Sequence, residues 1–515
     1  MRSNSIRILG VAIVTIYLLL AATANAADDL TKPIRVSPDG HFLVQPDGQP
    51  FFWLGDTAWA IFVRSTREEA DGYLKDRAHM GFTVIQAVAI GGTANPMLGG
   101  PNRFDAFPLI DSDPALPNPK YFEHVDWVVN RAAQYGLRIA MLPVWGDAVT
   151  GGYGEGGPQV KFNSKEAQAY GRWLAARYRH KGIIWVLGGD LTPLWKKDFG
   201  NEIGNGDIGV TDYRPVFDAM AQGITEGDGD NPFITYHPAC CSWSGTAHPR
   251  TSLYFHDRDW LDMNMLQSSH FLRPECFLGM TGMGFAWNAT FNYEPISDEY
   301  HSKPTRPVID GEARYENLPS DTQGWGPNAK SIGFWAAYDS RNAAYHSVFA
   351  GAAGYTYGNN SVFQFLNPEI QKPLFDAKKS WKSELDTPGA QQMRHVKTLM
   401  LSRPYFTHIP DQSIIVGDAG EGTGHIGATR DKDGSYAKFY LPHGQPITVD
   451  MSKIAGLHAV AWWFNPRSGT AQRVEGRFPT TGTATFNPPS RGAESDWVLV
   501  VDDESKGFGA PGAKL

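Results

Sequence analysis

The sequence predicts an α/β protein, a (β/α)8 TIM barrel followed by a small C-terminal β-sandwich. Short apolar runs that end in glycine or a polar residue recur eight times, and helical segments separate most of them. After about residue 390 the pattern changes to short alternating runs between turns rich in Gly, Asp, Asn and Pro, which is typical of a sandwich. We therefore expect the barrel over residues 33–390 and the sandwich over residues 391–505.

One apolar run shows the build of the predicted barrel strands. Residues 183–187 are Ile-Ile-Trp-Val-Leu, and Gly188, Gly189 and Asp190 follow. An unbroken apolar run of this length indicates a strand that is buried on both faces. The run that ends in Asp310, Gly311 and Glu312 has the same build. The eight predicted strand ends are Asp56, Gln86, Pro143, Asp190, His237, Gln267, Glu312 and Tyr357.

The segments between these strands carry helix signals. Thr66 and Glu69 have the spacing of a capping box and predict a helix that stops at Gly81. Ser164 is the expected N-cap of a later helix, and Asp339 is the expected cap of a helix that runs through Ala350.

The amino terminus predicts export. Arg2 and Arg7 precede an apolar run over residues 8–22, and Ala24-Asn25-Ala26 follows as a cleavage site. This arrangement indicates a secretory signal peptide over residues 1–26 and a periplasmic or extracellular protein. An uncleaved membrane anchor is the alternative. No later apolar run reaches the length of about 20 residues that a span needs, so we expect no stable membrane span after signal cleavage.

Composition excludes several functions. The formal net charge is −8 and no basic stripe is present, so nucleic acid is not an expected partner. Aromatic residues make up 12% of the chain, which suits a large core and also a site that stacks sugar rings. The three cysteines, Cys240, Cys241 and Cys276, are too few for a disulfide framework, and one bridge or burial as free thiols both remain open. No CxxC or HExxH spacing occurs, so neither a metal nor another cofactor is predicted.

Two carboxylates at predicted strand ends carry the chemical hypothesis. In a barrel of eight strands, Asp190 and Glu312 would face each other across the mouth, and such a pair suits glycoside hydrolysis. We assign Glu312 as nucleophile and Asp190 as acid/base. The structural alternatives are a helix N-cap for Asp190 and, for Glu312, an ion pair with Arg314 or another nearby arginine.

Other polar and aromatic residues near the predicted rim are candidates for substrate binding. Asp310, directly before Gly311, is not among the candidates, because we expect its side chain to point away from Glu312. Trp59 suits either a stacking wall or the core. The candidates are Asp56, Gln86, Trp145, His237, Gln267, His270, Arg314 and Tyr357.

Several of these segments resemble glycoside hydrolase family 140. The resemblance rests on Phe-Trp-Leu-Gly-Asp-Thr-Ala-Trp at residues 52–59, Gly-Gly-Asp at 188–190, Thr-Tyr-His-Pro at 235–238 and Asp-Gly-Glu-Ala-Arg-Tyr-Glu at 310–316. It covers roughly residues 33–390, and the tail resembles the β domain, labelled collagen-binding, that accompanies the family. The resemblance implies a retaining β-apiosidase of pectic rhamnogalacturonan II. It places the acid/base on Asp190 and the nucleophile on Glu312.

The resemblance also implies a plant cell-wall polysaccharide or oligosaccharide as substrate. Two other functions remain open at this point. One is a furanosidase of the same fold with another substrate, such as an arabinofuranosidase. The other is a carbohydrate- or matrix-binding protein with an inactive barrel, although a pure binder has no need of two opposed acids.

Overall fold

The computed structural model describes residues 30–92, 95–150, 161–196, 210–229, 231–240, 249–272, 288–323 and 330–513 of the chain. The predicted signal peptide, Cys241 and Cys276 lie outside these ranges. No helix among the described residues is both long and apolar enough to cross a membrane.

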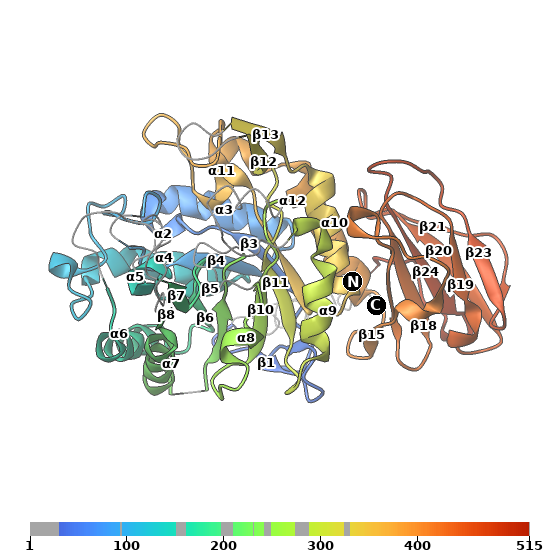
Figure 1. Cartoon of the computed structure of the whole chain (residues 1–515), viewed down its shortest axis with the longest axis horizontal. Helices are drawn as coiled ribbons and strands as arrows, with labels where there is room; N and C mark the ends of the chain where they lie inside the picture. Colours follow the sequence, from blue (N-terminus) through green and yellow to red (C-terminus); the bar gives the residue numbers. More distant parts are fainter. Residues whose placement is uncertain are drawn as a thin grey trace, which may run out of the picture.

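The centre of the molecule is a closed barrel of eight parallel strands, which confirms the predicted fold class (Figure 1). The strands pair in chain order, and the last pairs with the first. Every residue of these strands is buried, as expected for parallel strands covered on both faces. The strands are β3 (Trp53–Thr57), β4 (Val84–Val88), β5 (Arg138–Leu142), β6 (Ile184–Gly188), β9 (Phe233–His237), β10 (Met263–Gln267), β11 (Val308–Glu312) and β14 (Gly354–Tyr357).

Helices cover the outside of the barrel, and their starts test the predicted caps. Thr66 and Glu69 form the predicted capping box of α3 (Arg67–His79). The prediction for Ser164 was wrong, because Asn163 caps α6 (Ser164–Arg177), with Glu166 completing the box. Asp339 is not the cap of α10 (Ala337–Phe349) either; it lies in the first turn, where its carboxylate accepts the N–H of Ala336. The other helices of the layer include α4 (Pro119–Gln134), α7 (Arg214–Asp228), α9 (Tyr293–His301) and α12 (Pro388–Leu401).

The C-terminal part consists of antiparallel sheets packed face to face, as predicted. One sheet contains β15 (His408–Pro410), β17 (Gly427–Asp431), β18 (Tyr436–Leu441), β24 (Trp497–Asp503), β20 (His458–Phe464), β21 (Ala471–Arg473) and β22 (Phe478–Pro479). The other contains β16 (Ile415–Val416), β19 (Ile447–Asp450) and β23 (Thr483–Phe486). Apolar side chains between the sheets, such as Phe439, Val449 and Leu499, form a core of their own. The alternating runs that the sequence shows, over residues 413–416, 425–430, 436–441, 447–450, 459–464 and 497–501, correspond to six of these strands and include none of the short strands β15, β21, β22 and β23.

Helices α10 and α12 lie between the barrel strands and the C-terminal sheets (Figure 1). Arg341 on α10 makes a two-pronged ion pair with Asp496, at 2.7 and 2.8 Å, and both side chains are buried. Arg403, after α12, pairs in the same way with Asp502 on β24. Val498 and Val500 of β24 belong to the barrel's apolar cluster. Apolar packing and buried ion pairs therefore join the two parts.

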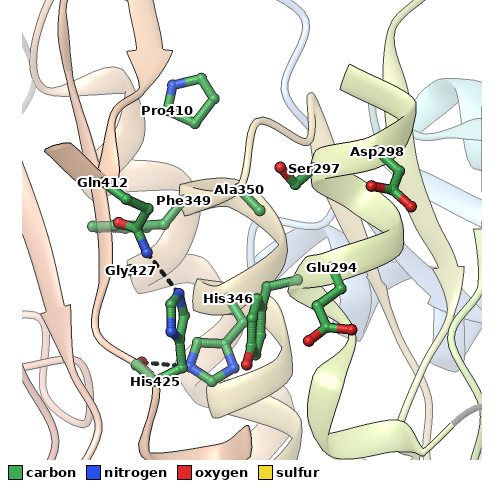
Figure 2. A pocket seen from close by; sticks show the side chains of 11 residues that line it. Glu294, Ser297, Asp298, His346, Phe349, Ala350, Pro410, Gln412, His425 and Gly427 are labelled. Carbon is green, nitrogen blue, oxygen red and sulfur yellow. Dashed lines mark hydrogen bonds between the residues drawn. The ribbon is translucent and has the colours of Figure 1, made fainter. Parts of the chain in front are cut away.

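A cavity of about 400 Å³ lies in this junction, between α9, α10 and the sheet that contains β17 (Figure 2). Gln412 contacts the His425 ring through its amide, and His346 shares a hydrogen bond of 2.9 Å with the His425 carbonyl. Glu294 and Asp298 of α9 also line this cavity. Its lining includes none of the residues at the carboxyl ends of the barrel strands.

Candidate active site

The two predicted catalytic carboxylates lie at the same end of the barrel. Asp190 follows β6, the fourth barrel strand, and Glu312 ends β11, the seventh. The strands between them, β9 and β10, end in His237 and Gln267. Four neighbouring strands thus bring an acid, a histidine, an amide and a second acid to one half of the barrel mouth.

The two glycines before Asp190 allow the sharp backbone turn that places this residue. Gly188 and Gly189 have φ angles of +83° and +118°, in the left-handed region where other residues are strained. A Cβ atom on Gly189 would lie 2.6 Å from the Trp145 ring. Asp190 itself has φ +54°, and residues 191–196 form bends and strand β7 (Leu194–Lys196) instead of a helix. The helix N-cap alternative for Asp190 is therefore wrong.

Glu312 is buried between two imidazoles. Its Oε1 lies 2.9 Å from Nε2 of His270, within a hydrogen bond, and its Oε2 lies 3.0 Å from Nε2 of His237. The ion pair with Arg314 that the sequence allowed is replaced by these contacts. Burial alone raises the pKa of Glu312, but its contacts with the two imidazoles outweigh burial and lower the pKa to about 2. Glu312 is therefore held as a carboxylate, which is the form that a nucleophile requires.

The tautomer of His237 follows from its other nitrogen. Nδ1 accepts the backbone N–H of Asp190 at 3.4 Å, so the neutral ring carries its proton on Nε2, the nitrogen that faces Glu312. Trp59 and Trp145 pack against this ring at 5.6 and 6.2 Å between centroids. Both indoles are buried, so both belong to the core and pack around the His237 ring.

Gln267 bridges the turn after β9 and the acid after β6. Its Oε1 accepts the backbone N–H of Cys240 at 2.5 Å, and its Nε2 donates to Oδ1 of Asp190 at 3.0 Å. Cys240 is disulfide-bonded. Of the two possibilities that the sequence left open, a bridge or a buried free thiol, the bridge is therefore the one formed at Cys240.

Tyr315 is a member of the site that sequence reasoning did not select. Its hydroxyl donates to Thr57 at 3.1 Å, and its ring lies 4.6 Å from that of His270. Burial raises the pKa of this phenol, and the negative charges of Glu312 and Asp190 raise it further. The phenol is therefore close enough to both carboxylates to be influenced by each. The sequence feature that could have pointed to Tyr315 is its position three residues after Glu312.

Four of the predicted binding residues are instead held in buried structural contacts. Asp56 pairs with Arg77 at 2.5 Å and accepts from Tyr73 at 2.6 Å. The hydroxyl of Tyr357 donates to Glu316, Arg314 donates to Asn342, and Gln86 donates to the carbonyl of Gly311. Each of the four has less than 1% of its surface exposed. The structure thus brings His237, Gln267, His270 and Trp145 to the two carboxylates, and it places these four elsewhere in the core.

Within the described ranges, no three His, Cys, Asp or Glu side chains are grouped so that they could hold a metal ion. The chemistry that the site offers on its own is proton transfer and nucleophilic attack by carboxylates.

A TIM barrel with paired carboxylates after its fourth and seventh strands defines this protein as a glycoside hydrolase, and similar solved structures agree. One, described as "Glycoside hydrolase", is 33% identical, with a TM-score of 0.78 over 93% of this chain and 98% of its own. Another, a glycoside hydrolase family 5 protein from Bacteroides vulgatus, is 31% identical, with a TM-score of 0.78 over 94% of this chain and 96% of its own.

The chain belongs to the family described as "Apiosidase-like, catalytic domain", whose model matches residues 37–407. Residues 409–502 match a second model, described as "Putative collagen-binding domain of a collagenase". No curated protein matches the chain.

Proposed function

We propose that this glycoside hydrolase is a retaining β-apiosidase that acts on apiose linkages of pectic rhamnogalacturonan II. The single observation that carries the mechanism is the buried Glu312 carboxylate held between His237 and His270, with Asp190 at the same barrel mouth. The apiosidase-like family match and the resemblance to glycoside hydrolase family 140 support the sugar.

The proposed reaction has two steps. In the first, Glu312 attacks the anomeric carbon while Asp190 gives its proton to the glycosidic oxygen, so that the bond to the leaving group breaks and a glycosyl ester forms. In the second, Asp190 takes a proton from water, the water oxygen attacks the same carbon, and the ester to Glu312 breaks. Two inversions leave the configuration of the sugar unchanged.

The test is incubation of the chain without residues 1–26 with rhamnogalacturonan II oligosaccharides that carry apiose, followed by product analysis. Cleavage at the apiosyl linkage with retained configuration, absent in Glu312→Gln, is the expected result. Cleavage of arabinofuranosides alone would keep the mechanism and replace the sugar. Turnover of neither, with saturable binding of the polysaccharide, would replace the enzyme by a carbohydrate-binding protein.

We also propose that the enzyme is exported and meets this plant cell-wall substrate in the periplasm or outside the cell. The charged start, apolar run and Ala-Asn-Ala site at residues 24–26 support export. Amino-terminal sequencing of the protein from its host should begin at Ala27, and a chain that retains Met1 in the membrane fraction would contradict cleavage.

A further inference from the structure

Gln267 is engaged at both ends of its side-chain amide. The carbonyl oxygen accepts from the backbone of Cys240, and the NH2 group donates to the Asp190 carboxylate. A backbone N–H can only donate, so its hydrogen bond fixes which end of the amide is the oxygen. The NH2 group must then face Asp190, and the bond to the carboxylate keeps its donor direction.

The same contacts argue against a role in binding sugar hydroxyls. Gln267 has only 1% of its surface exposed, and a hydroxyl-binding amide needs a donor or acceptor that substrate can reach. The residue lies opposite Glu312 in the pairing of β10 with β11, after a register shift that follows Leu266. The shift pairs Gln267 with Glu312 and skips Gly311, and the amide of Gln267 meets Asp190 from this last residue of β10.

Asp190 needs an external support of this kind. It lies on left-handed backbone directly after two glycines that also have positive φ, a conformation that persists only where contacts from the surrounding structure hold it. Its backbone N–H is joined to His237, but that bond does not orient the carboxylate.

We propose that Gln267 is a positioning residue for the acid/base group, which orients the Asp190 carboxylate and favours its ionised form. The proposal rests on the proposed function, in which Asp190 delivers and then recovers a proton. A hydrogen-bond donor stabilises the ionised form of a carboxylate. With Gln267 in place, Asp190 should therefore lose its proton at a lower pH than it would without this donor. Among the described residues, the titratable groups near Asp190 include His237 and Tyr315, and both of these connect it to Glu312, which His270 also contacts.

The test compares Gln267→Met, which keeps the length but removes the donor, with Gln267→Glu, which puts a negative charge beside Asp190. Gln86→Met is the matched control, because Gln86 is also a buried glutamine on a barrel strand, in the middle of β4, but it donates to the Gly311 carbonyl. Each variant is assayed on a glycoside with a poor alkyl leaving group and on one with a nitrophenyl leaving group, over a full pH range.

For Gln267→Met we expect kcat on the alkyl glycoside to fall about 10- to 100-fold and kcat on the nitrophenyl glycoside to fall about 3-fold or less, because a good leaving group needs little proton transfer. In Gln267→Met the basic limb of the pH profile of kcat/KM should move to higher pH by about 1 unit, and in Gln267→Glu it should move further in the same direction. Gln86→Met should lower kcat on the two glycosides by the same factor and leave the basic limb of kcat/KM at the wild-type pH. A higher KM with equal losses on both substrates and an unmoved limb would overturn the proposal.

A readout without turnover separates this proposal from the proposed function. The Asp190 carboxyl can be titrated by carbon NMR in the folded chain, and its pKa should be higher in Gln267→Met than in wild type. If wild type cleaves no glycoside, the proposed function fails, yet this titration still decides whether Gln267 acts on Asp190. An equal pKa in the two folded proteins would overturn the positioning role.

Discussion

Nε2 of His237 lies 3.0 Å from Oε2 of Glu312, and Nδ1 of the same ring accepts the backbone N–H of Asp190. One histidine thus connects the backbone of the proposed acid/base to the carboxylate of the proposed nucleophile. The ring is fully buried, and Trp59 and Trp145 pack against it. Packing in the core therefore fixes the ring that lies between the Asp190 backbone and the Glu312 carboxylate.

The first prediction concerns the nucleophile. Glu312→Gln should lower kcat by about 10⁴-fold or more, because an amide cannot form the glycosyl ester, while the fold is kept by the near-equal shape. In Glu312→Ala, added azide should restore turnover and give a glycosyl azide of inverted configuration. Product configuration by proton NMR is the measurement, and azide rescue with retained configuration would assign Glu312 the other role.

The second prediction concerns the acid/base group. Asp190→Ala should lose the most activity on substrates with a poor leaving group and the least on nitrophenyl glycosides, because only the former need a proton in the first step. Kinetics over a series of leaving groups measure this as a steeper dependence of kcat/KM on leaving-group pKa. An unchanged slope would show that Asp190 does not protonate the glycosidic oxygen.

The third prediction is a pH dependence. The hydrogen bond from His270 stabilises ionised Glu312, so its removal in His270→Ala should raise the pKa of Glu312 from its value of about 2. Since Glu312 must be ionised to attack, the acid limb of kcat/KM should move to higher pH, by about 1 unit. His395→Ala, on α12, is the control and should leave the limb unmoved. If the acid limb of kcat/KM stays at the wild-type pH in both variants, His270 does not stabilise the ionised form of Glu312.

The barrel could be predicted because its signals are local. Apolar runs that end in glycine or a polar residue mark strands buried on both faces, and all eight predicted strand ends lie at or within two residues of an observed strand end. The four strands missed in the C-terminal part have two to four residues each. Their places are set by pairing with distant strands, which periodicity does not report.

The site could be predicted only in part, for a geometric reason. A strand end gives the position of a residue but not the partner that its side chain finds. Asp56 and Glu312 both stand at strand ends, yet Asp56 meets Arg77 and Glu312 meets two histidines. Arg77 lies on α3, and nothing in its spacing from Asp56 signals the buried pair. The role of Gln267 likewise depends on a backbone N–H at Cys240, which no side-chain pattern reveals.

The fourth prediction concerns Lys438, a buried lysine on β18 whose ammonium donates to the carbonyl of Met400 at 3.3 Å. Burial lowers its pKa to about 7, against about 10.4 in an unfolded chain. Between these values only the unfolded state holds the proton, so the lysine destabilises the fold increasingly as the pH falls from about 10 to about 7, and the penalty is constant below. Lys438→Met should therefore be more stable than wild type by about 2 to 4 kcal/mol at pH 7, with the difference vanishing near pH 10. Melting temperatures of both proteins at the two pH values measure it, and an equal difference at both would contradict the depressed pKa.

The fifth prediction concerns the junction of the two domains. Asp496 accepts two hydrogen bonds from Arg341 and a third from the hydroxyl of Tyr440, all in a buried setting. Asp496→Ala leaves a guanidinium buried without its counter-charge and should cost about 3 to 5 kcal/mol of stability. The double variant Arg341→Met, Asp496→Leu removes both charges and should recover most of that loss.

Denaturant unfolding of the single and double variants measures this coupling. Turnover per folded molecule should stay at the wild-type value, since neither residue lies at the barrel mouth. If the loss of stability in the double variant equals the sum of the losses in Arg341→Met and Asp496→Leu, the two charges have no coupling energy and the prediction fails.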